Sequence, residues 1–160
     1  MTGTARYAIY YVPWPDTALG CFGQAWLGWD IWRARPTELM PLSGFNARLR
    51  KATIRTPRLY GFHATLKAPM VLRPGLSESA LRSAARDFAS GAPRITGLRL
   101  RLSRVDRFLA LTTAQPSPDL NALAAGCVLS FDPFRRPLQA NERARRKPET
   151  LTDRQRSYLD

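Results

Sequence analysis

Two kinds of hydrophobic periodicity alternate along the 160-residue sequence, and this alternation constrains the fold more than any other feature. Residues 6–12 are rich in aromatic and β-branched side chains and end at Pro13, a pattern typical of a strand. Between residues 94 and 114, leucines alternate with polar residues and a second apolar run follows. This pattern predicts a β-hairpin whose turn lies near residues 105–107.

Other apolar residues recur at the spacing of a helix. Asp16 is a candidate N-cap for a helix that runs to about Trp29. Ser77 and Ser117 precede two further helical patterns, and serine caps helices well. The helix after Ser117 is predicted to bury one face, formed by Leu120, Leu123, Ala124, Cys127, Val128 and Phe131. Residues 30–57 carry three prolines and are predicted to be irregular, with at most a short helix. Helices are interleaved with strands, and the predicted hairpin contributes two antiparallel strands. This pattern predicts an α+β fold rather than a doubly wound parallel sheet.

The chain is strongly basic, with 25 Lys and Arg against 12 Asp and Glu, a net charge of +13 and a pI near 11.1. Such a charge favours anionic partners such as nucleic acid or phosphate esters. However, arginine provides 22 of the basic residues and lysine 3, a skew that accompanies GC-rich coding without any functional cause. Both interpretations stay open. The sequence shows neither a secretory signal nor an apolar run of membrane-spanning length, so we expect a cytoplasmic protein without a membrane partner.

His63 is the single histidine of the sequence, and the two cysteines are far apart with no C-x-x-C spacing. A histidine-rich metal site, and any mechanism that needs two histidines, is therefore excluded within these 160 residues. We expect neither a metal ion nor another cofactor.

The residues around His63 read Tyr60-Gly-Phe-His-Ala-Thr-Leu-Lys-Ala-Pro69, and residues 59–67 predict a second strand. Side chains on a strand alternate between its two faces. One face is predicted to cover a core and consists of Tyr60, Phe62, Ala64 and Leu66. The other face is predicted to present His63, Thr65 and Lys67 together, with Gly61 leaving room for a ligand.

This face suits chemistry on phosphate esters. The His63 imidazole can accept or donate a proton, and the Thr65 hydroxyl can donate a hydrogen bond to a phosphate oxygen. Lys67 would add positive charge, and the segment from Arg48 to Arg73 contains seven Lys and Arg residues and no acidic residue. The alternative is structural, because a histidine flanked by apolar residues on a strand is commonly a packed side chain.

Three further residues are candidates for substrate binding. Arg99 and Arg101 lie on the polar side of the predicted hairpin, where they would either contact phosphate or face solvent. Tyr10 lies on the first predicted strand, where it would either stack on a base or pack within the fold.

The ten residues from Tyr60 to Pro69 resemble the first His-x-Thr motif of the two-histidine (2H) phosphoesterase superfamily. They are most similar to a branch of unknown function that is often encoded beside phosphonate-degradation genes. The resemblance spans nearly the whole chain, since it extends to residues 6–11, 25–28, 131–135 and 151–156.

The resemblance implies a bilobal α+β fold, with antiparallel sheets flanked by helices and one His-x-Thr strand from each lobe in a central cleft. It implies metal-free cleavage of cyclic phosphates or phosphodiesters, or the joining of RNA ends. One histidine then acts as base and the other as acid, while the threonines hold the phosphate. His63 and Thr65 correspond to the first motif.

The chain departs from the superfamily because the second His-x-Thr motif is absent. Superfamily members of this branch continue past the corresponding end, and Thr152–Gln155 predict the start of a helix that Asp160 interrupts. We therefore expect residues 1–160 to form one 2H-phosphoesterase-like domain with an incomplete second lobe, lacking its C-terminal part and retaining residual activity at most. A naturally degenerate protein is the alternative.

Two hypotheses of function follow. In the first, the full-length protein hydrolyses a small phosphodiester or cyclic phosphate and is linked to phosphonate metabolism. In the second, the chain is a non-catalytic module that binds RNA or a nucleotide, or an accessory protein whose charge is compositional. The oligomeric state is left open by the sequence.

Overall fold

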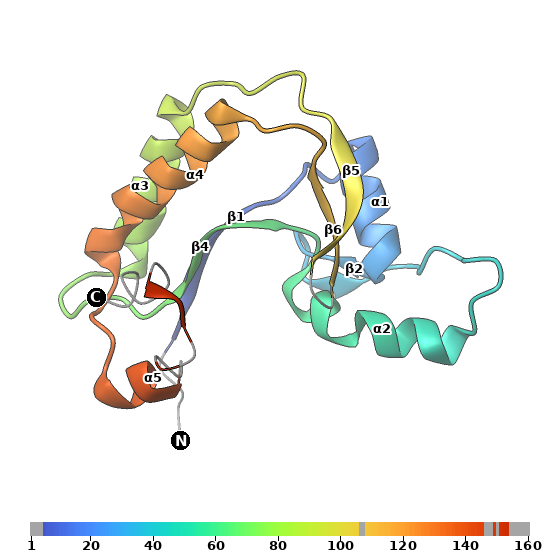
Figure 1. Ribbon diagram of the computed structural model, residues 1–160, viewed down its shortest axis with the longest axis horizontal. Coiled ribbons are helices and arrows are strands. Elements are labelled where there is room, and N and C mark those ends of the chain that lie inside the picture. Colours follow the sequence, from blue (N-terminus) through green and yellow to red (C-terminus); the bar gives the residue numbers. More distant parts are fainter. Residues whose placement is uncertain (1–4, 106–107, 146–148, 150, 154–160) are drawn as a thin grey trace. The chain divides into compact units, whose positions relative to one another are not determined.

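The computed structural model describes residues 5–105, 108–145, 149 and 151–153. The chain divides into two compact units. We call Ala8–Ala68 the N-terminal unit, and Pro69–Asp160 together with Met1–Tyr7 the C-terminal unit. Strands and helices alternate in the described residues and the sheets are small, which confirms the α+β fold (Figure 1). The predicted helix after Thr152 lies outside the described residues.

The described residues from 5 to 70 contain two helices and four strands. These elements are β1 (Tyr7–Tyr11), α1 (Ala18–Leu27), β2 (Trp29–Asp30), β3 (Arg35–Pro36), α2 (Ala47–Tyr60) and β4 (Ala64–Met70). Strands β1 and β4 pair with each other, and β2 pairs with β3 in an antiparallel arrangement. The pairing of β1 with β4 joins the opening strand to the segment that follows His63.

Helix α1 begins one residue later than the sequence suggests. Thr17, rather than Asp16, is the N-cap, and its side chain accepts a hydrogen bond from the Gly20 amide. The helix ends at Leu27, and Gly28 adopts a left-handed conformation with φ 60°. Gly23 allows a close approach, because a Cβ atom there would lie 2.3 Å from the Phe62 ring. Helix α1 therefore packs directly on the residue that precedes His63.

Helix α2 corrects two predictions, since residues 47–60 are helical where an irregular stretch and the start of a strand are expected. Asn46 caps the helix, and its side chain accepts a hydrogen bond from the Arg48 amide. Pro57 lies inside the helix near its C-terminal end, at the cost of one i→i−4 hydrogen bond. Tyr60 is therefore the last residue of a helix and not part of a strand. Because 53% of the Tyr60 surface is exposed, this residue does not cover a core as predicted.

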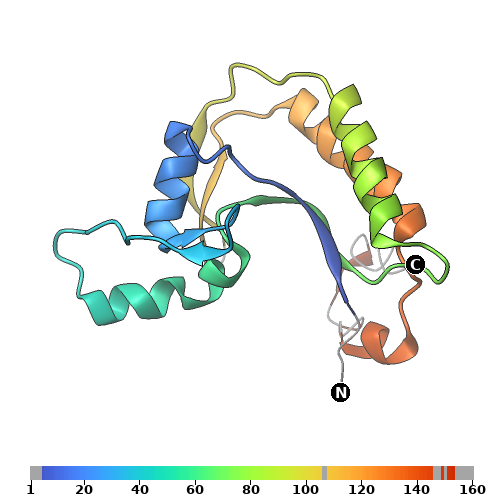
Figure 2. The ribbon, with the colours of Figure 1, turned by 180° about the vertical axis from the view of Figure 1, so that it is seen from behind.

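The C-terminal unit contains a helix pair and a hairpin. Its elements are α3 (Glu78–Gly91), β5 (Leu100–Val105), β6 (Phe108–Thr113), α4 (Pro118–Phe131), the 3₁₀ helix η1 (Asp132–Phe134) and α5 (Ala140–Arg145). Ser77 and Ser117 cap α3 and α4 through side-chain acceptors, as predicted. The two helices lie side by side, which is also visible from behind (Figure 2).

Aromatic packing holds the core of this unit. Phe131 is fully buried, and its ring lies 5.5 Å from the Phe88 ring of α3 in an edge-on arrangement. Cys127 is also fully buried, one turn earlier on the same face. Val128 is an exception to the predicted apolar face, because it is 44% exposed. The helix pair therefore covers a narrower face of α4 than its sequence suggests.

The predicted hairpin is confirmed, because β5 and β6 pair in an antiparallel register that places Leu102 opposite Leu111. Its predicted turn includes residues 106 and 107, which lie outside the described residues. Opposed residues share a face of the pleat. One face therefore carries the leucines at 100, 102, 109 and 111, and Leu102 and Leu109 are 69% and 63% exposed.

Candidate active site

The His63 imidazole is held by two hydrogen bonds within the N-terminal unit. Its Nδ1 lies 2.9 Å from the Gly61 carbonyl oxygen, and its Nε2 lies 3.1 Å from Thr65 Oγ1. A carbonyl oxygen can only accept, so Nδ1 carries the proton in the neutral ring. Nε2 then has a free lone pair that accepts from the Thr65 hydroxyl. The ring therefore directs its basic nitrogen toward the hydroxyl side of the strand.

The contact between His63 and Thr65 confirms that these two side chains point to the same side. His63 directly precedes β4, and Thr65 is the second residue of that strand. Thr65 is exposed and His63 is half-buried. A ligand can therefore approach the hydroxyl from solvent while the imidazole remains supported by the protein.

Gly61 positions His63 in a way that the sequence does not predict. Its φ of 72° lies in the region that favours glycine, and the residue is buried. A Cβ atom there would lie 2.7 Å from Ile31, so Ile31 occupies the space that was expected to admit a ligand. That expectation is wrong for this position. The role of Gly61 is to turn its carbonyl toward His63 while Ile31 packs against its α-carbon.

Asp30 fixes the turn that carries Ile31. Asp30 is 1% exposed, and its carboxylate accepts hydrogen bonds from the Trp32 amide, the Arg33 amide and the Arg33 guanidinium at 2.9–3.1 Å. Burial by itself raises the pKa of Asp30. The hydrogen bonds from Arg33 and Trp32 outweigh burial, so the pKa of this carboxyl lies below its usual range. An ionised Asp30 thus supports Gly61 through Ile31.

Tyr10 stacks on His63 from the neighbouring strand. The two ring centroids are 3.9 Å apart and the rings are inclined by 28°. Tyr10 lies on β1, which pairs with β4, so the contact joins the two paired strands. One face of the Tyr10 ring is therefore in contact with the imidazole. Of the two interpretations of Tyr10, packing within the fold is the one that this contact shows, and it brings Tyr10 into the candidate site.

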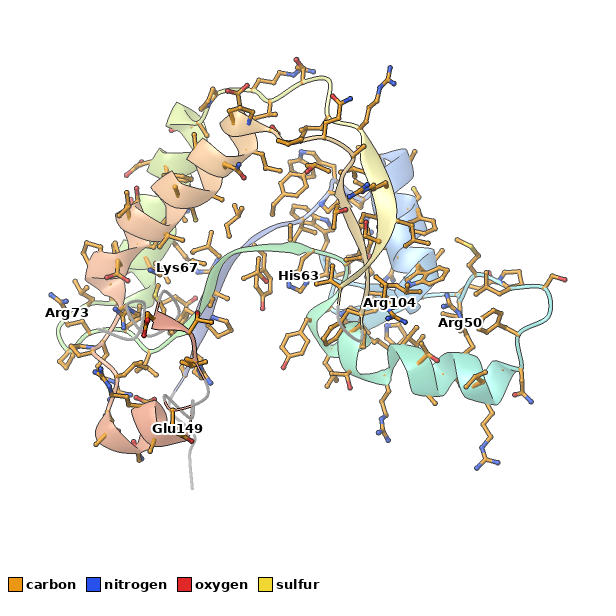
Figure 3. The ribbon with its side chains drawn as sticks, viewed as in Figure 1. Arg50, His63, Lys67, Arg73, Arg104 and Glu149 are labelled. Carbon is orange, nitrogen blue, oxygen red and sulfur yellow. The ribbon has the colours of Figure 1, made fainter. Side chains whose placement is uncertain are left out.

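Lys67 lies farther along β4 than Thr65. Lys67 follows His63 by four positions, which is a rise of about 13 Å along an extended chain, and Figure 3 shows the two side chains at separate places along the strand. Lys67 is buried, with 7% of its surface exposed, whereas Thr65 is exposed. Ala64 is exposed as well, so the strand does not show the clean alternation of a buried and an open face that its sequence suggests.

Arg99 and Arg101 belong to the C-terminal unit, on the hairpin. Arg101 is exposed on β5 and pairs in register with Thr112, on the face opposite the leucines. Arg99 is exposed just before β5, and its carbonyl accepts a hydrogen bond from the Ala114 amide. The sequence alternation of leucine and polar residues is confirmed here. A contact of either arginine with substrate stays a prediction.

The described residues contain no group of three or more His, Cys, Asp and Glu side chains arranged to hold a metal ion. None of the helices in the described part of the chain is both long and apolar enough to cross a membrane.

Two relatives match most of the chain, and both carry the name ribose 1,5-bisphosphate phosphokinase PhnN. The protein from Janthinobacterium sp. (strain Marseille) is 35% identical over 154 residues, which cover 96% of this chain and 34% of the relative. The protein from Laribacter hongkongensis (strain HLHK9) is 37% identical over 147 residues, which cover 86% of this chain and 34% of the relative. The chain thus spans about a third of the length of these relatives. No solved structure matches it significantly.

A family model described as protein of unknown function (DUF1045) matches residues 65–160. The match begins at Thr65 in the candidate site and covers more than half of the 160 residues. The chain therefore belongs to the DUF1045 family.

Proposed function

We propose that this chain carries the His-x-Thr half-site of a 2H-type phosphoesterase that hydrolyses a small phosphodiester or cyclic phosphate. The observation that carries the proposal is the hydrogen bond between His63 Nε2 and the exposed Thr65 hydroxyl. It places a proton acceptor and a hydrogen-bond donor within one phosphate diameter of each other. The fixed Nδ1 proton leaves Nε2 as the nitrogen that acts.

The proposed step transfers two protons and exchanges one P–O bond for another. Thr65 turns its hydroxyl from Nε2 to a non-bridging phosphate oxygen when substrate binds. His63 Nε2 takes a proton from water as the water oxygen forms its bond to phosphorus. The opposite P–O bond breaks, and the departing oxygen takes a proton from an acid. The resemblance assigns that acid to a second histidine, which the 160 residues do not contain.

The names of the two relatives narrow the substrates worth testing. Both are named as kinases of ribose 1,5-bisphosphate, and their PhnN designation supports the implied link to phosphonate metabolism. Hydrolysis of a cyclic phosphate ester leaves a phosphate monoester and a free hydroxyl. A 5-phosphoribose cyclic ester that spans O1 and O2 would, on opening at O2, give ribose 1,5-bisphosphate. We propose a ribose-based cyclic phosphate as the substrate class.

The test is hydrolysis of a substrate panel by the purified chain. The panel contains 5-phosphoribose 1,2-cyclic phosphate, a nucleoside 2′,3′-cyclic phosphate and a linear aryl phosphodiester. We expect His63→Ala to lower kcat/KM by about 10²–10⁴-fold, the usual contribution of an acid–base residue. Thr65→Val should lower it by roughly 10–100-fold, as expected for a hydrogen bond to a charged group.

Thr113→Val is the matched control, because Thr113 also lies on a strand but in the hairpin of the other unit. It should leave kcat/KM within about twofold of the parent. Turnover that survives His63→Ala unchanged would contradict the proposal. So would the same loss in Thr65→Val and in Thr113→Val, since the loss would then report general destabilisation.

The second hypothesis, binding of RNA or a nucleotide without catalysis, is favoured by the net charge of +13. It predicts that single-stranded RNA binds to the chain with an affinity that falls steeply as the salt concentration rises. It also predicts that the purified chain forms no product from any substrate of the panel. Absence of binding at low salt would remove this alternative.

A further inference from the structure

We propose that Tyr10 is a positioning residue for His63, and that its ring sets the plane of the imidazole. The catalytic consequence rests on the proposed function, whereas the positioning itself does not. The observation is the stack of the two rings, with centroids 3.9 Å apart and an inclination of 28°. No other aromatic ring in the described part of the chain makes a ring contact with His63.

The two hydrogen bonds of His63 leave one motion of the ring weakly restrained. The Nδ1 proton and the Nε2 lone pair both point outward in the plane of the imidazole. Bonds to Gly61 and Thr65 therefore resist displacement within that plane. Movement perpendicular to the plane only bends them and costs little. A ring packed against one face opposes this movement directly.

The support for Tyr10 is itself rigid. Tyr10 lies on β1, and backbone pairing holds β1 against β4. A side chain anchored on a paired strand holds its neighbour more precisely than one on a loop. Tyr10 is half-buried, whereas the adjacent Tyr11 is 56% exposed and, by alternation along the strand, points to the other face. Tyr11 therefore provides a matched control on the same strand.

The single histidine makes the positioning measurable without a substrate, because all imidazole signals in the NMR spectrum come from His63. In the parent chain, the His63 ring protons over Tyr10 should be shifted upfield by the ring current. The ¹⁵N shifts at high pH should show the proton on Nδ1. Tyr10→Leu and Tyr10→Ile should remove the upfield shift and mix the two tautomers. Tyr10→Phe and Tyr11→Leu should keep the parent spectrum.

The kinetic readout separates positioning from binding. Tyr10→Leu should lower kcat by about tenfold on the best panel substrate, since small misplacements of a reacting group slow the chemical step. KM should change by less than about twofold, and Tyr10→Phe should restore kcat. Dispersed amide signals in each variant establish that it is folded.

Two results would overturn the proposal: a proton that stays on Nδ1, without tautomer mixing, in both Tyr10→Leu and Tyr10→Ile, or equal tautomer mixing in Tyr11→Leu. Failure of the proposed function gives a different pattern. The parent and every variant would then lack turnover, while the His63 spectrum would still respond to loss of the Tyr10 ring.

Discussion

At the scale of single residues, the candidate site depends on a glycine that carries no functional group. Gly61 turns its carbonyl to His63 Nδ1 because its φ is 72°, and Ile31 fills the space where a side chain would stand. The sequence places Gly61 beside His63 and correctly pairs His63 with Thr65, because residues two apart on an extended chain share a face. The sequence does not predict the contact between Gly61 and Ile31, because Ile31 lies thirty positions before Gly61.

Gly61→Ala should destabilise the chain and release the imidazole. Gly61 has φ 72° and ψ 178°, a region that residues with a Cβ atom almost never adopt and that costs about 1–3 kcal/mol, and the clash with Ile31 adds to that cost. Chemical denaturation should therefore show that the free energy of unfolding falls by more than the conformational cost alone. The NMR spectrum of His63 should show mixed tautomers.

Gly44→Ala is the control for this change. Gly44 has φ 76°, but nothing lies within 4 Å of a Cβ atom built there. It should lose only about 1–2 kcal/mol and leave the His63 tautomer as in the parent. Equal losses at the two positions would mean that Ile31 does not constrain Gly61.

At the scale of elements, local sequence signals predicted the starts of α3 and α4 correctly but failed to predict helix α2. Ser117 followed by Pro118 fixes the start of α4, because both residues act within a single turn. Pro57 misled the prediction, because proline inside a helix removes one i→i−4 hydrogen bond and usually ends or kinks the helix, whereas here α2 continues past it. Three residues of α2 follow Pro57, so the helix reaches Tyr60 and moves the start of β4 to Ala64.

Two glycines inside helices should respond in opposite ways to alanine. Alanine is favoured over glycine within a helix by about 1 kcal/mol. In α4, a Cβ atom at Gly126 would lie 3.6 Å from the Phe88 ring, which is an ordinary contact, so Gly126→Ala should stabilise by roughly 0.5–1 kcal/mol. In α1, a Cβ atom at Gly23 would lie 2.3 Å from the Phe62 ring, so Gly23→Ala should destabilise.

Urea denaturation measures both changes in the free energy of unfolding. Because Phe62 precedes His63, Gly23→Ala should also alter the NMR signals of the imidazole, and Gly126→Ala should not. Stabilisation by both substitutions would show that α1 does not pack on Phe62 as described.

At the scale of the whole molecule, three described carboxyls have pKa values below their usual range. Hydrogen bonds lower the pKa of Glu78 through Arg82 and Tyr7, and that of Glu142 through the Gln139 amide and Arg136. For Asp30, hydrogen bonds from Arg33 and Trp32 outweigh the effect of burial. Such carboxyls stabilise both units, since Asp30 belongs to the N-terminal unit and Glu78 and Glu142 belong to the C-terminal unit.

Acid should therefore destabilise the chain. A carboxyl whose pKa is lower in the folded state contributes stability above its unfolded pKa of about 4, and that contribution is lost as pH falls through the folded pKa. We expect Tm to fall as the pH is lowered below about 4. Asp30→Asn should lower Tm at neutral pH and reduce the slope of Tm against pH in the acid range.

High salt distinguishes the buried carboxyl from the exposed ion pair. Salt screens the exposed Glu78–Arg82 pair more than the hydrogen bonds of Asp30, which is 1% exposed. The difference in acid slope between the parent and Asp30→Asn should thus persist at high salt. An acid slope that is identical in the two proteins would contradict the role assigned to Asp30.

The sequence by itself determined the α+β class, the caps of α3 and α4, the hairpin with its alternating faces, and the placement of His63 and Thr65 on the same side. Each of these depends on residues within a few positions of one another, where strand and helix periodicities act directly. The tertiary structure decided which residues hold the imidazole. Tyr10 and Ile31 reach His63 and Gly61 from distant parts of the chain. Contacts of this kind are set by strand pairing and by the filling of space, which no local pattern records.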